Sequence, residues 1–237
     1  MFPLVCFKGH TSEGASYVIR KYCPADRERV RFICSETGFL GSPQEPFFYG
    51  REEFADLWSA YWTDYEPAGA FVAEVEGQVE GYLLGCLDTR LQEKVWKRRT
   101  VPDVGRRMLR REWWRHPQNR AMLRALFREN LFNLMQSKQV PSMEEVVREY
   151  PAHLHTNIAG PRFRGAGLGK KLMIAYIRFL KERGIKGVHL GTTSHNREAV
   201  PFYRRMGFEV LVKRRMRIYD HVIADPPLYF LCMGQKL

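Results

Sequence analysis

The chain has 237 residues, of which 45% are hydrophobic and 27% charged, and its formal net charge is +12 at pH 7. This composition is typical of a globular protein, and it excludes a disordered tail, a collagen and a coiled coil. No apolar run approaches the roughly 18 residues of a membrane-spanning helix. The first six residues lack the basic stretch and apolar core of a signal peptide.

The five cysteines lie far apart, at Cys6, Cys23, Cys34, Cys86 and Cys232. Their number is odd and they form no CxxC pair, which argues against a zinc ribbon and against a disulfide framework. A reducing, cytoplasmic location is the simplest expectation.

The N-terminal third predicts alternating strands and helices. Ser16–Arg20 is expected as a strand, and Pro24 opens a helix that ends near Gly38. A loop follows over 41–50. Apolar residues at helical spacing predict a second helix over Glu52–Trp62. Two β-rich runs around Glu76-Gly77-Gln78 predict a hairpin over 69–85.

A basic segment follows, with eleven basic and three acidic residues between positions 90 and 120. The helical period and the breaks expected at Pro102, Pro117 and Pro141 predict helices inserted between two strands. The insertion covers about 89–150 of a single domain, 1–237. One apolar stripe is expected to pack against the main domain: Leu123, Leu126, Phe127, Leu131 and Leu134.

The C-terminal part predicts the order β-α-β-α-β-β and hence an α/β (α+β) fold. The expected strands are 153–159, 188–192, 209–219 and 228–233. The expected helices are 165–183, which stops at Gly184, and 196–206.

A glycine-rich turn stands between the first of these strands and the long helix: Arg164-Gly165-Ala166-Gly167-Leu168-Gly169. Glycines let a backbone approach a ligand closely, and the free N–H groups at a helix start attract anions. The spacing matches neither the dinucleotide fingerprint GxGxxG nor the Walker A loop. Taken alone, the turn is either a phosphate cradle or a structural turn.

A second motif, Asn196-Arg197-Glu198-Ala199-Val200-Pro201-Phe202-Tyr203 followed by Gly207-Phe208, lies about 30 residues further on. Together the two segments read R-x-x-G-x-G and N-x-x-A-x-x-F-Y-x-x-x-G-F. This pattern resembles the GNAT superfamily of N-acetyltransferases. The resemblance is specific over about 153–208. It is nearest to the acetyltransferase-like domain of O-GlcNAc hydrolases and its stand-alone bacterial relatives, on residues 36–41, 65–67 and 152–155.

The resemblance implies an acetyl-CoA-dependent N-acetyltransferase with a GNAT-like, mostly antiparallel central sheet, splayed at two central strands and flanked by helices. The pantetheine arm would pair with the backbone of Asn157, Ile158 and Ala159. The pyrophosphate would meet the N–H groups of Arg164, Gly165, Ala166, Gly167, Leu168, Gly169 and Lys170. Asn196 would contact the cofactor arm, and Tyr203 would be the general acid that protonates the departing thiolate.

The general base is open. His153, His155 and Asn157 share one face of their strand, because strand side chains alternate. A histidine near its reference pKa of about 6.5 is a reasonable base. The resemblance implies an acidic residue near Asn157, where an amide stands. His153 and His155 are also possible metal ligands, but the sequence offers no third, so no metal is expected.

Two further hypotheses stay open. A module of the same fold that binds acyl-CoA or a protein partner, with weak or no catalysis, would account for the amide at Asn157. The basic segment, with Trp96, Trp113 and Trp114, suits a nucleic acid or a membrane surface, but no nucleic-acid-binding motif accompanies it and a solvated helical face is preferred. A third use is a lid that steers an acidic acceptor or the cofactor phosphates. The amine acceptor and the oligomeric state cannot be read from the sequence.

Overall fold

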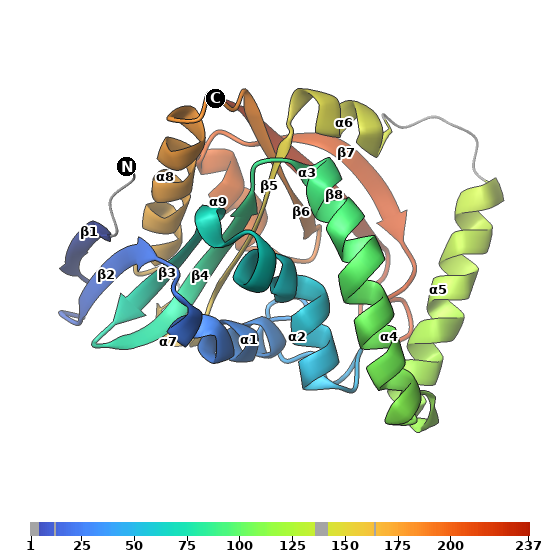
Figure 1. Ribbon diagram of the computed structural model, residues 1–237. Helices are drawn as coiled ribbons and strands as arrows, with labels where there is room; N and C mark the ends of the chain where they lie inside the picture. The colour runs from blue at the N-terminus through green and yellow to red at the C-terminus, as the bar shows by residue number, and fades with distance from the viewer. Residues whose placement is uncertain (1–4, 12, 136–141, 164) are drawn as a thin grey trace.

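The computed structural model describes residues 5–11, 13–135, 142–163 and 165–237 (Figure 1). Its centre is an eight-stranded sheet with the order β1-β2-β3-β4-β5-β6-β8-β7. The strands are β1 (Val5–His10), β2 (Ser16–Lys21), β3 (Ala70–Val75), β4 (Gln78–Cys86), β5 (Ala152–Ile158), β6 (Gly187–Thr193), β7 (Glu209–Met216) and β8 (Leu228–Lys236). Neighbouring strands are antiparallel, except that β5 and β6 are parallel.

The sheet opens between β5 and β6. These two strands pair only from Ala152 to Leu154. Beyond that point β5 stays paired with β4 through Ile158, whereas β6 stays paired with β8 through Thr193. The ends of β5 and β6 therefore diverge, as the resemblance to the GNAT superfamily implied for two central strands.

Helices cover both faces of the sheet. On one face, α8 (Leu168–Lys181) buries Leu172, Tyr176 and Phe179 against β3, β4 and β5, and α9 (Ala199–Arg205) packs nearby through Tyr203. On the other face lie α1 (Arg27–Glu36) and α2 (Arg51–Ala60), which ends in a π-helical turn, Tyr61–Tyr65. A short helical turn, α7 (Gly160–Phe163), joins β5 to the glycine-rich segment.

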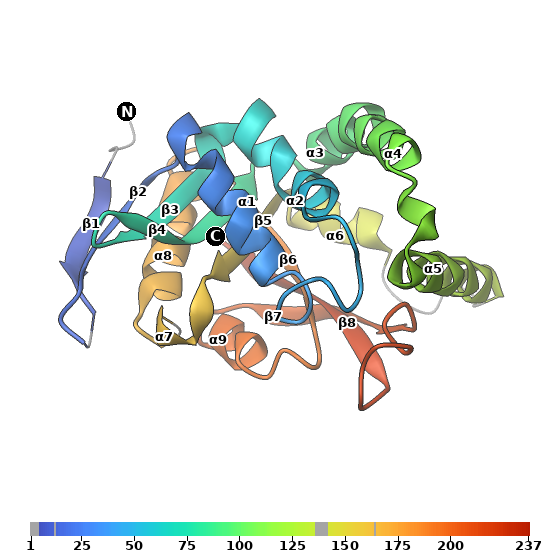
Figure 2. The same cartoon turned by 90° about the horizontal axis from the view of Figure 1, so that it is seen from below.

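The basic segment forms the helices between β4 and β5. They are α3 (Thr89–Val95), a π-helical turn (Trp96–Thr100), α4 (Val101–Arg110), α5 (Pro117–Met135) and α6 (Met143–Glu149). Helices α4 and α5 stand at the end of the molecule opposite β1 and α8 (Figures 1 and 2). The helices from Thr89 to Glu149 thus lie between β4 and β5 along the chain.

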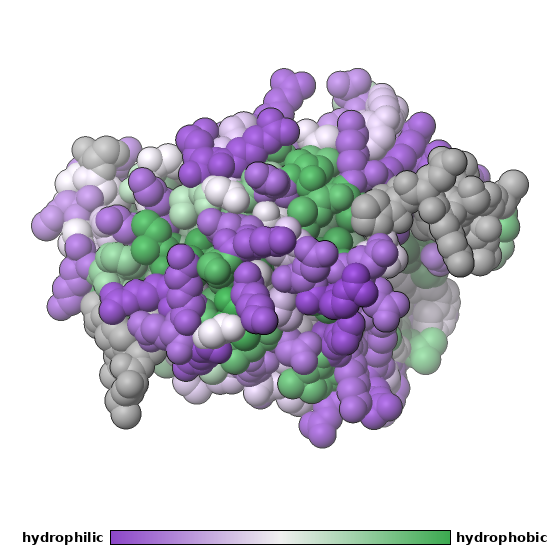
Figure 3. All heavy atoms as spheres, turned by 90° about the horizontal axis from the view of Figure 1, so that it is seen from above, coloured by the Kyte–Doolittle hydropathy of each residue, from purple (hydrophilic) through white to green (hydrophobic). Residues whose placement is uncertain are grey.

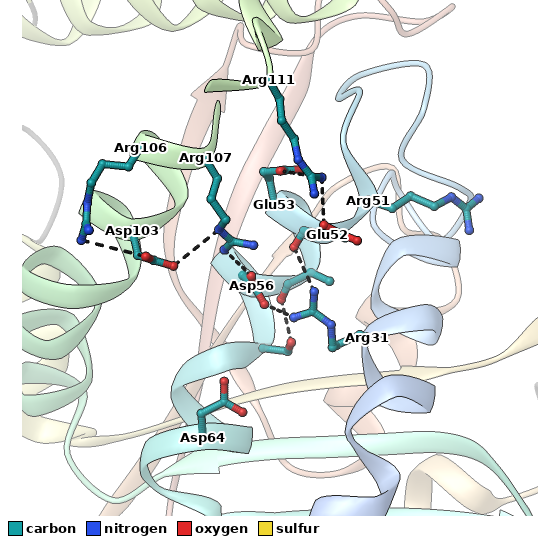
Figure 4. Close-up of polar contacts among 12 residues, drawn as sticks. Arg31, Arg51, Glu52, Glu53, Asp56, Asp64, Asp103, Arg106, Arg107 and Arg111 are labelled. Carbon is teal, nitrogen blue, oxygen red and sulfur yellow. Dashed lines mark hydrogen bonds and ion pairs between the residues drawn. The ribbon is translucent and has the colours of Figure 1, made fainter. Parts of the chain in front are cut away.

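Ion pairs attach α4 to α2. Asp56 of α2 is buried and accepts hydrogen bonds from Arg31 of α1 and Arg107 of α4 (Figure 4). Arg111 pairs with Glu52 at 2.8 Å and with Glu53 at 3.3 Å. Part of the positive charge of the basic segment therefore has a structural role, because it neutralises acidic side chains of α2 rather than facing an external partner.

Two expectations for the insertion were wrong. Pro102 does not break the helix: residues 89–110 are continuously helical, and Pro102 follows directly on a π-helical turn, where the regular hydrogen-bond pattern of the helix already changes. The apolar stripe of α5 packs only in part. Leu126 contacts the core, but Leu123, Phe127 and Leu131 are exposed, because α5 rests on the neighbouring side that carries Met122 and Ala125. The side chain of Leu134 lies outside the described part.

Hydrophilic side chains cover most of the face drawn in Figure 3, with apolar patches between them. Within the described part of the chain, no helix combines the length and the apolar character needed to cross a bilayer. Strand β1 was not assigned from the sequence, although it extends the sheet by pairing with β2.

Candidate active site

The two sequence motifs come together at one cavity of about 1060 Å³, next to the opening between β5 and β6. Three groups of residues line it: the β5 end with the glycine-rich turn, the α9 region, and the loop after α1. They are Thr156, Asn157, Ile158, Phe163, Gly165, Gly167, Leu168, Gly169 and Lys170; then His195 to Ala199, Pro201, Phe202, Tyr203, Arg205 and Met206; and Thr37, Leu40 and Gly41.

The glycine-rich turn presents backbone donors to this cavity. Gly165 and Gly167 both have φ of +83°, a conformation that favours glycine, and a Cβ at either position would meet open space. Helix α8 starts at Leu168, and its first intrahelical bond comes from the N–H of Lys171 to Gly167. The N–H groups of Leu168, Gly169 and Lys170 therefore have no partner within the helix and fit an anion such as a pyrophosphate. Arg164, predicted for the same role, lies outside the described residues.

The backbone of β5 divides its hydrogen bonds between two sides. The N–H of Ala159 donates to the carbonyl of Glu80 at 2.7 Å. Because hydrogen-bonded pairs alternate along antiparallel strands, Asn157, which faces Tyr82, also directs its backbone toward β4. The backbone of Thr156 and Ile158 faces the opening instead. The structure thus supports Ile158 as a backbone partner for pantetheine. It does not support the prediction for Ala159, whose N–H is already engaged, or for the backbone of Asn157.

Tyr203 lies on α9 with its ring between Phe202 and Phe208. It is 7% exposed and lines the cavity, and its hydroxyl has no hydrogen-bond partner in the described part of the chain. Burial raises the pKa of Tyr203 to about 12, so the phenol holds its proton at neutral pH. Such a group can donate a proton and cannot act as a base.

Asn196 supports the start of α9. Its Oδ1 accepts a hydrogen bond from the N–H of Ala199 at 3.2 Å, and its side chain lines the cavity. With Oδ1 engaged, the amide Nδ2 of Asn196 is the group that would contact a ligand.

The two candidate bases lie behind the cavity rather than on its lining. His155 contacts Asn157 through Nε2 at 3.3 Å and faces Trp58 and Tyr82. His153 lies against His189 and Trp62. Burial lowers the pKa of His155 to about 4 and that of His153 well below its usual value. Both imidazoles are therefore neutral at pH 7, and His155 is the nearer to the cavity through its contact with Asn157.

Sequence reasoning missed the turn that forms the third wall of the cavity. Phe39 and Ser42 exchange two backbone hydrogen bonds of 2.9 Å, and between them Leu40 and Gly41 have φ of +54° and +87°. Two central residues with positive φ define a type I′ turn, which is strained for leucine. Phe39 and Phe47 pack on Tyr219 of the β7–β8 loop and hold this wall in place. The only signal in the sequence was the segment 36–41, which carried part of the family resemblance.

The family model of the acetyltransferase (GNAT) family matches residues 40–208, more than half of the chain. The chain belongs to this family. The match spans the glycine-rich turn, Asn196 and Tyr203, so all three lie inside the region that defines GNAT proteins.

Curated relatives resemble short parts of this GNAT chain. An uncharacterized N-acetyltransferase of Methanocaldococcus jannaschii is 40% identical over 58 residues, which are 24% of this chain and 26% of that protein. A mycothiol acetyltransferase of Arthrobacter sp. is 46% identical over 48 residues, which are 20% of this chain and 15% of that protein. The chain thus spans about a quarter or less of the length of these relatives.

Solved structures resemble nearly the whole chain. SsHAT has a TM-score of 0.64 at 28% identity, over 93% of this chain and 98% of that chain. A Drosophila melanogaster polyamine N-acetyltransferase has a TM-score of 0.58 at 16% identity, over 93% and 100%. The yncA protein of Salmonella typhimurium, solved with its cofactor acetyl-CoA, has a TM-score of 0.52 at 15% identity, over 93% and 94%. The last two likenesses concern the fold.

The described residues offer no cluster of side chains that supports the alternative of a metal site at His153 and His155. No group of three or more His, Cys, Asp or Glu side chains there is placed to hold a metal ion. The two histidines of β5 instead contact the rings of Trp58 and Trp62, the amide of Asn157 and the imidazole of His189.

Proposed function

We propose that this GNAT protein is an acetyl-CoA-dependent N-acetyltransferase that transfers an acetyl group to an amine by direct attack. One observation carries the proposal: the backbone donors of the glycine-rich turn and the protonated phenol of Tyr203 line the same cavity, at the point where the sheet opens. The backbone donors at one end would bind the diphosphate of CoA. The phenol further along the cavity would protonate the thiolate that departs from the thioester.

The residues divide the work of binding. The N–H groups of Leu168, Gly169 and Lys170 would hold the pyrophosphate, with the positive end of the α8 dipole contributing about 0.3–1 kcal/mol. The backbone of Thr156 and Ile158 would pair with the pantetheine amides, and Nδ2 of Asn196 would contact the same arm. Acetyl-CoA would supply the activated acetyl group.

Tyr203 would act at the departing sulfur. The amine nitrogen forms a bond to the acetyl carbon, the carbon–sulfur bond breaks, and the phenol gives its proton to the thiolate. The proton lost from the amine passes through water to the solvent, and Tyr203 is then reprotonated. A positioned general acid of this kind contributes about 10²–10⁴ in rate.

Acetyl-CoA binding and transfer are tested separately. Calorimetry with acetyl-CoA and free CoA measures the first, and CoA release with spermidine, agmatine, glucosamine and lysine-containing peptides measures the second. We expect Tyr203→Phe to lower kcat by about 10²–10⁴ and to change the Kd for acetyl-CoA less than twofold. The matched control is Tyr65→Phe, which removes the hydroxyl of an exposed tyrosine packed beside Arg99.

The outcomes separate the two candidate functions. Unchanged turnover in Tyr203→Phe would remove Tyr203 from the mechanism. Acetyl-CoA binding without transfer to any amine would favour the second candidate, a catalytically weak or inactive acyl-CoA-binding or protein-interaction module. The observation behind that candidate is that the face of β5 offers Asn157 and two neutral histidines of lowered pKa, and no carboxylate.

The nearer kinship to the acetyltransferase-like domain of O-GlcNAc hydrolases stays a prediction, as does the cytoplasmic location. The first is supported by residues 36–41, which form a cavity wall. The second is supported by five cysteines that are all free. A direct contact of the basic segment with nucleic acid is not part of the proposal, because Arg107 and Arg111 are paired with α2.

A further inference from the structure

Asn157 is held between two side chains of the sheet while it lines the cavity. Its Nδ2 lies 2.8 Å from the hydroxyl of Tyr82 on β4 and 3.3 Å from Nε2 of His155 on its own strand. In the described part of the chain, Oδ1 of Asn157 has no hydrogen-bond partner. The amide is thus anchored by its nitrogen, and its oxygen is the polar atom left for a ligand.

The surroundings explain why the nitrogen faces inward. Tyr82 is fully buried, and its hydroxyl oxygen accepts a hydrogen bond from Nδ2 of Asn157 at 2.8 Å. His155 is neutral, so one of its ring nitrogens accepts a hydrogen bond. Asn157 therefore donates both hydrogens of its NH₂ group to fixed acceptors, and this places the proton of His155 on Nδ1.

We propose that Asn157 orients the acceptor amine in the transfer reaction, its Oδ1 accepting a hydrogen bond from an N–H of the attacking nitrogen. The inference rests on the proposed function and deepens it. Because Oδ1 is fixed at the cavity wall, it selects a nucleophile that carries an N–H. The hydrogen bond turns that N–H toward β5, so the lone pair of the same nitrogen points away from β5. An amide has no proton to take up at neutral pH, so Asn157 positions the amine and does not deprotonate it.

The orientation is measurable without any substrate. If the amide were reversed, Oδ1 would accept from Tyr82 and from a protonated Nε2 of His155, and the NH₂ group would face the cavity. Nitrogen-15 NMR of the free protein at pH 7, with His155→Gln to assign the resonance, distinguishes the two. We expect His155 to carry its proton on Nδ1. A proton on Nε2 would overturn the proposal.

Kinetics test the role itself. Asn157→Leu keeps the approximate shape and removes the acceptor atom, whereas Asn157→Asp keeps an oxygen acceptor. With the amine of highest turnover in the panel, we expect Asn157→Leu to lower kcat/KM for the amine about 10- to 100-fold and Asn157→Asp to stay within about threefold of wild type. The Kd for acetyl-CoA should change less than twofold in both.

Two results would contradict the role. One is wild-type kcat/KM in Asn157→Leu; the other is an equal loss in the leucine and aspartate variants, which would indicate a structural effect only. If Asn157→Leu does not fold, the NMR result on wild-type protein still decides. Failure of the proposed function looks different, because the wild-type protein would then either not bind acetyl-CoA or bind it without transfer to any amine of the panel.

Discussion

The cofactor side of the cavity and the inserted helices are built by different physical means. Around Gly165, Gly167 and the start of α8, the backbone itself provides the chemistry, through positive φ angles and N–H groups without intrahelical partners. In α4, side chains provide the attachment, through arginines paired with acidic residues of α2 (Figure 4). The first arrangement depends on few positions in sequence; the second depends on charge pairs between distant segments.

This contrast gives the two regions different sensitivities. A backbone site is damaged by a change of conformation at one glycine, and the damage appears in ligand affinity. A charge-paired contact is damaged by loss of a partner, and the damage appears in the free energy of unfolding. Asp56 for the insertion and Gly167 for the cofactor side are the positions where each effect should be largest.

The largest loss of stability is expected from Asp56→Ala. Asp56 is only 10% exposed in its side chain and is paired with Arg31, itself 11% exposed, and with Arg107. Removing the carboxylate leaves the buried guanidinium of Arg31 with the exposed carboxylate of Glu28, 3.8 Å away, as its counter-charge, and this loss costs about 3 kcal/mol. For a chain of this size that corresponds to a fall in Tm of about 6–12 °C, measured by thermal denaturation.

Asp103→Ala is the control for this prediction. It removes the same charge from α4, but Asp103 is 59% exposed and lies 3.5 Å from Arg107 and 3.9 Å from Arg106. An exposed pair of this kind contributes at most about 1 kcal/mol. Equal losses of Tm in the two variants would show that the buried Asp56 contributes no more to stability than the exposed Asp103. The attachment of α4 to α2 would then not depend on the pair of Asp56 and Arg107.

On the cofactor side we expect Gly167→Ala to weaken acetyl-CoA binding. A Cβ strains a residue at φ of +83° by about 1–2 kcal/mol, and relief of that strain would turn the first N–H groups of α8 away. The expected rise in Kd is about 5- to 30-fold by calorimetry. Gly105→Ala in α4 is the matched control: it should stabilise a helix by up to about 1 kcal/mol and leave the Kd unchanged. A Kd that stays at the wild-type value in Gly167→Ala would contradict the role of this turn.

The same contrast explains what the sequence could predict. The glycine-rich turn could be predicted as an anion site from its glycines and its place before a helix, and the alternation of β5 placed His155 and Asn157 on one face. The role of Tyr203 was predicted from the resemblance to the GNAT superfamily. The wall at Leu40, the pairing of Arg107 with Asp56 and the exposure of Phe127 depend on which distant segments meet. Those contacts are decided by tertiary packing, so neither local charge nor helical period could reveal them.

His155 lies between the cavity and α2, the helix to which the insertion is attached, with Asn157 on one side and Trp58 on the other. In the unfolded chain a histidine has a pKa of about 6.5, whereas burial lowers the pKa of His155 to about 4 in the folded protein. As the pH falls from 7 to 5.5, the unfolded state therefore binds a proton that the folded state does not. Linkage then requires the free energy of unfolding to fall over this range, by about 1 kcal/mol from this residue.

Urea denaturation at pH 7 and pH 5.5 measures this effect by difference. His155→Gln has no titrating side chain but keeps an oxygen that can accept from Asn157. We expect wild type to lose about 1 kcal/mol more than His155→Gln between the two pH values. His153 and His189, whose pKa values are also lowered by burial, are present in both proteins, so the effect of their burial cancels in the comparison. Parallel losses in the two proteins would mean that His155 takes up its proton as readily when folded. Nε2 would then not be a reliable acceptor for Asn157, and His155 would not link α2 to the cavity.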